Sequence, residues 1–176
     1  MTLPTTTLVF GGARSGKSSY AEQLVEVYEQ GLYLATAPTA NDDTEMAERI
    51  AKHRERRGPM WHTFEEPLEL AEAITKLARA ERPVLVDCLT LWLSNLMLAE
   101  RDPEAATDVL IKALRQSPGP VVLVSNEVGM GIVPENALAR TFRDCAGRLN
   151  QVVAGAADRV IFVAAGLPLV MKDENT

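Results

Sequence analysis

Residues 11–18 read Gly-Gly-Ala-Arg-Ser-Gly-Lys-Ser, a complete Gly-x-x-x-x-Gly-Lys-Ser phosphate-loop motif. The motif follows the apolar run 7–10 and precedes a segment with helical periodicity, which predicts a strand, a tight turn and a helix in that order. In this arrangement backbone N–H groups surround phosphate oxygens, Lys17 reaches the β- and γ-phosphates, and the Ser18 hydroxyl joins a Mg²⁺ shell. The motif therefore predicts binding of a nucleoside triphosphate. A glycine-rich turn that binds nothing would not need the Lys-Ser pair at this place.

Short apolar runs alternate along the chain with segments of helical periodicity. The runs lack the apolar–polar alternation of half-exposed strands and are typical of parallel strands covered on both faces. We therefore expect one domain over residues 1–176, with a three-layer α/β, P-loop NTPase-like fold around a mostly parallel sheet. The predicted strands are 5–10, 32–35, 61–64, 83–86, 121–124, 160–163 and 169–171, and the predicted helices are 17–29, 41–58, 67–80, 89–100, 103–115 and 135–153.

Capping residues and apolar stripes give the predicted helices their ends and faces. Pro67 is expected in the first turn of the helix 67–80, and Asp102 is expected to cap the helix 103–115. The last helix, 135–153, is expected to have one apolar face, formed by Leu138, Phe142, Cys145, Leu149 and Val152.

Charge and cysteine content limit the partners and the compartment of the protein. Eighteen basic and 24 acidic residues give a net charge of −6, which offers no general attraction to nucleic acid or anionic lipid. The longest apolar run, 160–171, contains a glycine and a proline and is too short to span a bilayer. No leader is evident at the N-terminus, so we expect a cytoplasmic protein without a membrane anchor. Cys88 and Cys145 have no metal-ligand spacing and are interpreted as reduced packing residues.

Polar residues follow several of the predicted strands. Ligands of open α/β sheets gather at the carboxyl ends of the strands, so Thr36, Asp87 and Asn126-Glu127 should converge beside the phosphate loop. Asp87 ends a strand that we expect to neighbour the phosphate-loop strand, where a carboxylate can hold Mg²⁺. The alternative is that Asp87 caps the helix beginning at Leu89.

The chain has only two histidines, and they stand in different surroundings. His53 lies beside Arg54 on a polar helix, and His62 follows Trp61 in a predicted strand. A histidine on a charged helix face is commonly only solvated. The arginines at 54–57, interrupted by Glu55, form either a solvated helix end or a phosphate contact near a nucleotide site.

Several blocks in order along the chain resemble the bifunctional adenosylcobinamide kinase/adenosylcobinamide-phosphate guanylyltransferase family of cobalamin biosynthesis. Besides the phosphate loop, the resemblance rests on Tyr-Leu-Ala-Thr-Ala at 33–37, Arg-Ile-Ala-Lys-His-Arg at 49–54, Trp-His-Thr-Phe-Glu at 61–65, Asn-Glu-Val-Gly-Met-Gly-Ile-Val-Pro-Glu-Asn at 126–136, Phe-Arg-Asp at 142–144 and Ala-Gly-Arg-Leu-Asn-Gln at 146–151.

The resemblance implies a role for particular residues. His53 occupies the position of the family's histidine that carries a covalent GMP, with Lys17 as the second catalytic residue, and Ser18 and Asp87 would hold Mg²⁺. Taken alone, Glu65 could simply begin the next helix near its positive dipole end. The nucleotide-binding residues implied by the resemblance are Gly11, Gly12, Ala13, Arg14, Ser15, Gly16, Lys17, Ser18, Ala35, Thr36, Ala37, Arg54, Glu55, Arg56, Arg57, Glu65 and Asp87.

The resemblance also implies two reactions and a homotrimer. Adenosylcobinamide is phosphorylated by ATP or GTP, and adenosylcobinamide phosphate then receives GMP from His53. The extended face of the helix 135–153 is the expected packing surface between copies. Two other interpretations remain open from the residues alone. One is a small-molecule kinase with an arginine-rich lid, and the other is a nucleotide-dependent switch or assembly ATPase.

Overall fold

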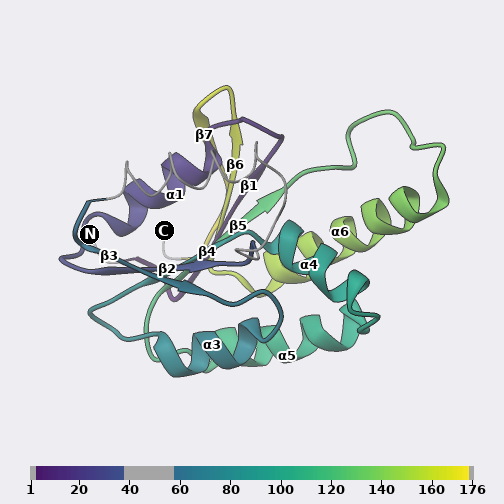
Figure 1. Cartoon of the computed structure of the whole chain (residues 1–176). Helices are drawn as coiled ribbons and strands as arrows, with labels where there is room; N and C mark the ends of the chain where they lie inside the picture. Colours follow the sequence, from purple (N-terminus) through teal and green to yellow (C-terminus); the bar gives the residue numbers. More distant parts are fainter. Residues whose placement is uncertain (1–2, 38–57, 175–176) are drawn as a thin grey trace.

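The computed structural model describes residues 3–37 and 58–174, and Figure 1 shows their arrangement. Apart from Gly58, the predicted helix 41–58 lies outside the described residues. The strands are β1 (Thr6–Gly11), β2 (Gly31–Ala35), β3 (Trp61–Glu65), β4 (Val84–Asp87), β5 (Val121–Asn126), β6 (Arg159–Ala164) and β7 (Leu167–Asp173). The helices are α1 (Lys17–Val25), α3 (Leu70–Leu77), α4 (Leu89–Leu98), α5 (Pro103–Arg115) and α6 (Ala137–Ala156).

One seven-stranded sheet runs through these residues in the order β3-β2-β4-β5-β1-β6-β7. Every pairing is parallel except the last, between β6 and β7, which is antiparallel. The predicted mostly parallel α/β fold is therefore confirmed. The expectation that β4 neighbours the phosphate-loop strand is wrong, because β5 pairs with β1 on one side and with β4 on the other.

Helices cover both faces of the sheet, which makes three layers (Figure 1). Leu8, Leu34 and Leu123 face the side where α3, α4, α5 and α6 pack. Val9 and Val124 face the other side, where Ala21 and Val25 of α1 pack. Neighbouring residues of one strand thus enter different layers, as the pleat requires, and this double burial explains why the strands read as continuous apolar runs.

Two helices on the larger face, α5 and α6, have side-chain N-caps, and α3 begins later than expected. Asp102 Oδ1 accepts hydrogen bonds from the backbone of Glu104 and Ala105, which confirms it as the N-cap of α5. α3 starts at Leu70, so Pro67 is not in its first turn. Instead the Pro67 carbonyl accepts a hydrogen bond from Asn95 Nδ2, which ties the loop to α4.

The predicted apolar face of α6 is only partly correct. Leu149 is buried, but Leu138 is 66% exposed and Val152 is 41% exposed. Ala146, Asn150 and Val153 complete the buried side instead. The first turns of α6 extend beyond the strands (Figure 1), so their apolar side chains have no sheet beneath them.

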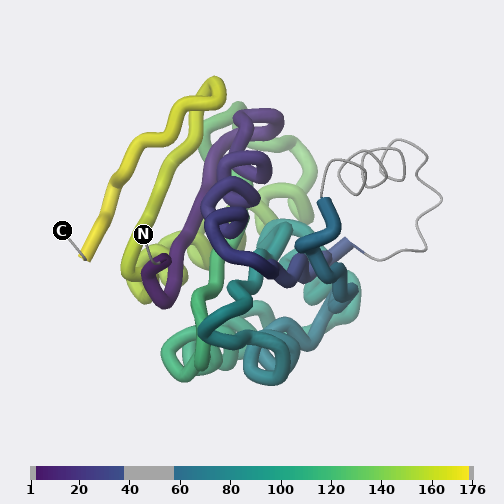
Figure 2. The backbone as a smooth tube through the Cα atoms, turned by 90° about the vertical axis from the view of Figure 1, so that its left-hand side faces the viewer, coloured from purple at the N-terminus to yellow at the C-terminus, as the bar shows by residue number. Residues whose placement is uncertain are grey.

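The sheet ends at β3 on one side and at the β6–β7 hairpin on the other. The hairpin is the yellow part of the tube at one side of the molecule in Figure 2. Leu167, Leu169, Val170 and Met171 of β7 are exposed. In the part of the chain that the structure describes, no helix is both long and apolar enough to cross a membrane.

Candidate nucleotide-binding site

The phosphate loop connects β1 to α1 and has the backbone that its glycines predict. Gly16 has φ +95°, a left-handed value that L side chains rarely adopt, and a Cβ there would lie 3.1 Å from Gly166 Cα. Lys17 is the first residue of α1, is only 6% exposed, and donates from Nζ to the Gly12 carbonyl at 3.1 Å. The ammonium group is therefore drawn back over the loop, which the N-terminus of α1 closes.

Two segments distant in the sequence hold the loop in place. Gly166 N, in the β6–β7 turn, donates to the Ser15 carbonyl at 2.8 Å, and Glu127 N, after β5, donates to the Gly11 carbonyl at 2.9 Å. Ser15 Oγ is buried and has no hydrogen-bond partner among the described residues. A buried hydroxyl without a partner is costly, and a phosphate oxygen would satisfy it.

Asp87 is the last residue of β4, at the end of the sheet where β1 runs into the phosphate loop. Its backbone pairs with Ala35 in register, and its Oδ2 accepts a hydrogen bond from the Tyr33 hydroxyl at 2.9 Å. The alternative role as helix cap is wrong, because Cys88 is the N-cap of α4 and makes no side-chain capping bond. Of the described residues only Tyr33 donates to this carboxylate, so its other oxygen is available to a ligand.

Thr36 links the ends of β2 and β4. Its hydroxyl donates to the Cys88 carbonyl and accepts from the Cys88 N–H, both at 2.8 Å, and its own N–H donates to the Asp87 carbonyl. Asn95 of α4 donates to the Thr36 carbonyl at 2.8 Å. The ends of β1, β2, β4 and β5, which we call the carboxyl edge, therefore converge as predicted for Thr36, Asp87 and Asn126-Glu127.

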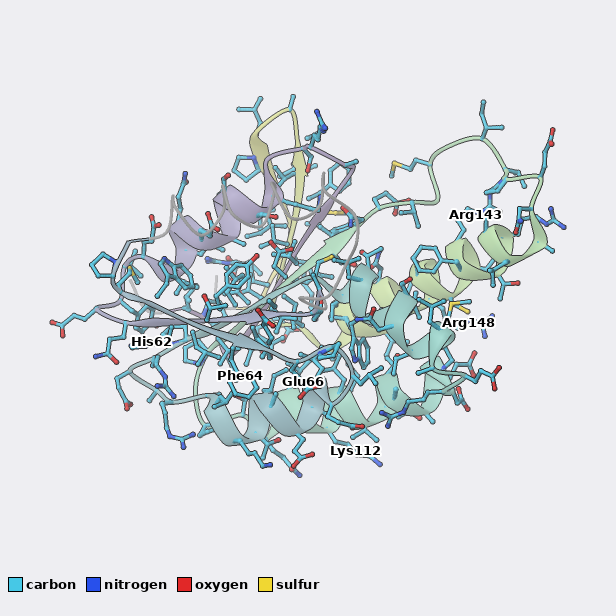
Figure 3. The ribbon with its side chains drawn as sticks, viewed as in Figure 1. His62, Phe64, Glu66, Lys112, Arg143 and Arg148 are labelled. Carbon is cyan, nitrogen blue, oxygen red and sulfur yellow. The ribbon has the colours of Figure 1, made fainter. Side chains whose placement is uncertain are left out.

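Two acidic residues at the end of β3, Glu65 and Glu66, make different contacts. Glu65 pairs with Ala35 in register, so the end of β3 adjoins the carboxyl edge at the end of β2. Ala37 lies two residues beyond Ala35 in the chain. The idea that Glu65 begins the next helix is wrong, because α3 starts only at Leu70. It is Glu66 that orders the intervening turn, where its Oε1 accepts hydrogen bonds from the N–H groups of Leu68 and Glu69. Figure 3 shows Glu66 beside α3.

Of the two histidines, only His62 lies among the described residues. His62 is exposed and lies on the edge strand β3, paired with Leu32 near the start of the strand (Figure 3). His53, with Arg54, Glu55, Arg56 and Arg57, lies outside the described residues.

Sequence reasoning missed Tyr33, which lies on β2 two residues before Ala35. Alternation along the strand gave the signal, because both side chains face the α1 layer with Leu85. Cys88 is also buried beside Asp87, and burial, with the Asp87 charge adding to it, raises the pKa of its thiol to about 11. A thiol that remains protonated is a poor nucleophile, which agrees with its interpretation as a packing residue. Both cysteines are free.

The side chains at the carboxyl edge suit Mg²⁺. The Ser18 hydroxyl and the Asp87 carboxylate carry oxygen donors, the ligand type that this hard cation prefers. Among the described residues no group of three or more His, Cys, Asp or Glu could form a metal cage. Mg²⁺ at nucleotide sites is held by one or two protein ligands together with phosphates, so the sparse donor set fits.

A parallel sheet whose first strand runs through a Gly-Lys-Ser loop into a helix, with an acidic residue at the end of a nearby strand, defines a P-loop nucleotide-binding protein. The sequence profile of the cobinamide kinase / cobinamide phosphate guanyltransferase family matches residues 7–171. The chain belongs to this family and is an enzyme.

Two bacterial relatives match nearly the whole chain. The bifunctional adenosylcobalamin biosynthesis protein CobP of Pseudomonas aeruginosa is 49% identical over 173 residues, covering 95% of this chain and 97% of the relative. The protein CobU of Salmonella typhimurium is 46% identical over 180 residues, covering 94% and 98%. The family resemblance expected from the sequence blocks is thereby confirmed.

Solved structures support the fold at low sequence identity. An ATPase of a bacterial type III secretion system is similar with a TM-score of 0.56 at 11% identity, covering 94% of this chain and 56% of that chain. The P4 protein of bacteriophage phi6, in complex with ADP, gives a TM-score of 0.51 at 16% identity, covering 95% and 53%.

Proposed function

We propose that this enzyme phosphorylates adenosylcobinamide with ATP or GTP and then transfers GMP from GTP, through a guanylyl-histidine at His53, to adenosylcobinamide phosphate. The product would be adenosylcobinamide-GDP, an intermediate of cobalamin biosynthesis. Membership of the family supports both reactions. The observation that carries the proposal is that the phosphate loop with Lys17 lies beside the carboxyl edge, where Asp87 is the last residue of β4.

In the kinase reaction the acceptor hydroxyl would attack the γ-phosphorus while the bond to the β–γ bridging oxygen breaks. Lys17 would stabilise charge on the phosphoryl oxygens, together with the loop N–H groups of residues 12–18. Ser18 and Asp87 would hold Mg²⁺, which supplies positive charge to the triphosphate when bound. Tyr33 would orient the Asp87 carboxylate through its hydrogen bond.

In the guanylyl transfer, a neutral His53 imidazole would attack the α-phosphorus of GTP and release pyrophosphate. A phosphate oxygen of adenosylcobinamide phosphate would then attack the same phosphorus, the bond from phosphorus to the His53 nitrogen would break, and the free imidazole would be restored. Splitting the transfer into two displacements is covalent catalysis. We assign nucleotide contacts to Ala35, Thr36, Ala37 and Glu65 at the carboxyl edge, and to Arg54, Glu55, Arg56 and Arg57 after the histidine.

Incubation with α-labelled GTP, followed by denaturing electrophoresis, tests the proposal. We expect wild-type protein to keep the label, to lose it in acid and to retain it in alkali, as a phosphoramidate does. His53→Asn should take up no label and still phosphorylate adenosylcobinamide, because the phosphate loop is unchanged. His62→Asn, on the exposed strand β3, is the matched control and should label normally.

The same experiment separates the rival functions. A simple nucleotide kinase with an arginine lid would phosphorylate its acceptor and never acquire the label. A switch or assembly ATPase would consume GTP without stoichiometric phosphorylation of any small acceptor. Label on the His53→Asn protein would assign the nucleophile to another residue.

We further propose that the 176 residues act as one catalytic domain and assemble as a homotrimer in the cytoplasm, where ATP and GTP are available. Apolar side chains that the monomer leaves exposed support assembly. Ile132 and Met130, on the loop that projects between β5 and α6 in Figure 1, are 97% and 80% exposed, and Leu138 follows on α6. Burying apolar surface of this kind against another copy is favourable.

A further inference from the structure

The side chain of Asn126 lies at the carboxyl edge between the phosphate loop and Asp87. β5 is the strand between β1 and β4, and Asn126 pairs in register with Gly11. Val122 and Val124 face the α1 layer, so by alternation Asn126 faces the same side. Leu85 also faces this layer, so Asp87, two residues further along β4, shares it.

Two helices fix the backbone of Asn126. Thr90 Oγ1 on α4 accepts its N–H at 2.7 Å, and Asn150 Nδ2 on α6 donates to its carbonyl at 3.1 Å. The ladder between β4 and β5 runs only as far as the pair of Asp87 and Val124, so β4 supplies no partner beyond that point. The backbone N–H and carbonyl of Asn126 therefore bond to the side chains of Thr90 and Asn150 in place of a neighbouring strand.

Both ends of the Asn150 side-chain amide make hydrogen bonds. It is buried, and its Oδ1 accepts a hydrogen bond from Ser125 Oγ at 2.6 Å. Buried polar groups are costly unless they are paired, and a network whose members are all paired holds its residues in one geometry. The structure thus gives the end of β5 a defined position relative to the phosphate loop.

The side-chain amide of Asn126, by contrast, makes only a weak hydrogen bond with the described residues. Of the described residues only Cys88 meets it, with 3.9 Å between Nδ2 and Sγ. A protonated thiol is a weak acceptor, whereas a phosphoryl oxygen forms a shorter and stronger bond because it is charged. The donor is therefore positioned and available.

We infer that Asn126 donates a hydrogen bond to the γ-phosphoryl group that is transferred in the kinase reaction, and that Thr90 and Asn150 are positioning residues for it. The inference rests on the kinase half of the proposed function. In that step the acceptor oxygen bonds to the γ-phosphorus, the β–γ bridging oxygen leaves with the nucleoside diphosphate, and the hydroxyl proton passes to solvent. Asn126 neither gains nor loses a proton.

Nucleotide binding to the full-length chain tests the contact without any corrinoid. The probes are fluorescent GDP and a fluorescent non-hydrolysable GTP analogue, each with Mg²⁺. Asn126→Ala should weaken the triphosphate about tenfold or more, the effect expected of one hydrogen bond to a charged group, and leave GDP affinity unchanged. Equal weakening of both nucleotides would mean a structural role and overturn the inference, as would no change in either.

Turnover provides the second measurement. Asn126→Ala should lower the kcat for adenosylcobinamide phosphorylation about a hundredfold, and Asn126→Asp should be slower still because its charge repels the phosphoryl oxygens. Labelling by α-labelled GTP should fall much less, because attack there is at the α-phosphorus. Asn136→Ala, at the exposed N-cap of α6, is the matched control and should phosphorylate at the wild-type rate.

Thr90 offers an isosteric test of positioning. Thr90→Val removes the acceptor for the Asn126 N–H, so it should reduce the preference for triphosphate over diphosphate and lower kcat. Thr90→Ser keeps the oxygen and should restore both. Failure of the serine to restore them would overturn the positioning role.

The inference and the proposed function fail in different ways. An Asn126→Ala enzyme with wild-type turnover and binding, beside an inactive Lys17→Ala enzyme, would overturn the inference and leave the kinase assignment intact. The opposite outcome can also be distinguished. If Asn126→Ala weakened only the triphosphate, but the wild-type protein phosphorylated no adenosylcobinamide, the kinase assignment would be overturned and the phosphate contact would still be supported.

Discussion

At the residue scale, burial decides the chemistry of the two cysteines. Cys88 is enclosed between the ends of β4 and α4, and burial, more than the adjacent Asp87 charge, raises its pKa to about 11. Cys145, on α6, is partly exposed. The two thiols should therefore react at very different rates, although the sequence gives no reason to rank them.

We expect a thiol reagent at pH 8 to modify Cys145 and leave Cys88 unmodified in the folded protein. A raised pKa means less thiolate at any pH below it, so Cys88 should gain reactivity only as the pH approaches about 11. Mass spectrometry of peptides after timed alkylation measures both rates. A Cys145→Ser variant that is still modified quickly at pH 8 would contradict this assignment.

Asp87 supports a second prediction at this scale. Asp87→Asn should lower both the kinase and the guanylyltransferase rates about a hundred- to thousandfold, because it removes charge from the proposed Mg²⁺ shell that the two reactions share. Activity measured across a Mg²⁺ titration tests this, and Glu69→Gln, on the exposed surface, serves as the control. Wild-type rates at limiting Mg²⁺ would remove Asp87 from the metal shell.

At the scale of elements, the turn before β5 depends on close packing against the turn before β4. A Cβ on Gly119 would lie 2.0 Å from the Arg79 carbonyl oxygen, and this neighbour is backbone that cannot rotate away. Gly147, in the middle of α6, has nothing within 4 Å of its Cβ position. The same substitution should therefore have opposite effects at these two glycines.

We expect Gly119→Ala to lower the free energy of unfolding by about 1–3 kcal/mol, the usual cost of forced overlap in a packed region. Gly147→Ala should raise it by about 0.5–1 kcal/mol, because alanine restricts the unfolded chain and favours helix. Urea denaturation of both variants measures the two changes. If the two variants were equally stable, the turn at Gly119 would be able to shift and accept the alanine Cβ without loss of stability.

At the scale of the whole molecule, the exposed apolar loop and the first turns of α6 bear on assembly. Light scattering at micromolar concentration should give about three times the 19.2 kDa mass of one chain. Ile132→Asp should shift the protein toward smaller species, because it places a charge on the most exposed apolar side chain of the loop. Val27→Asp, just after α1, is the control, and a wild-type mass of 19.2 kDa would reject the trimer.

The sequence by itself determined the fold class and the chemistry of the phosphate loop. Parallel strands buried on both faces leave continuous apolar runs, and the loop needs glycines, Lys17 and Ser18 in one contiguous segment, so both signals are local. Local signals also identified Asp102 as a cap, and Thr36, Asp87 and Asn126 as polar residues at the ends of strands.

Only the tertiary structure decided the order of the strands and the partners of these residues. Nothing in the β5 segment predicts that it lies between β1 and β4, because strand order depends on crossovers that join distant segments. The hydrogen bonds between the Asn126 backbone and the side chains of Thr90 and Asn150 join α4, α6 and β5, which are far apart in the sequence. The exposure of Leu138 likewise depends on where the sheet beneath α6 ends, a property of the packed molecule that helical periodicity does not contain.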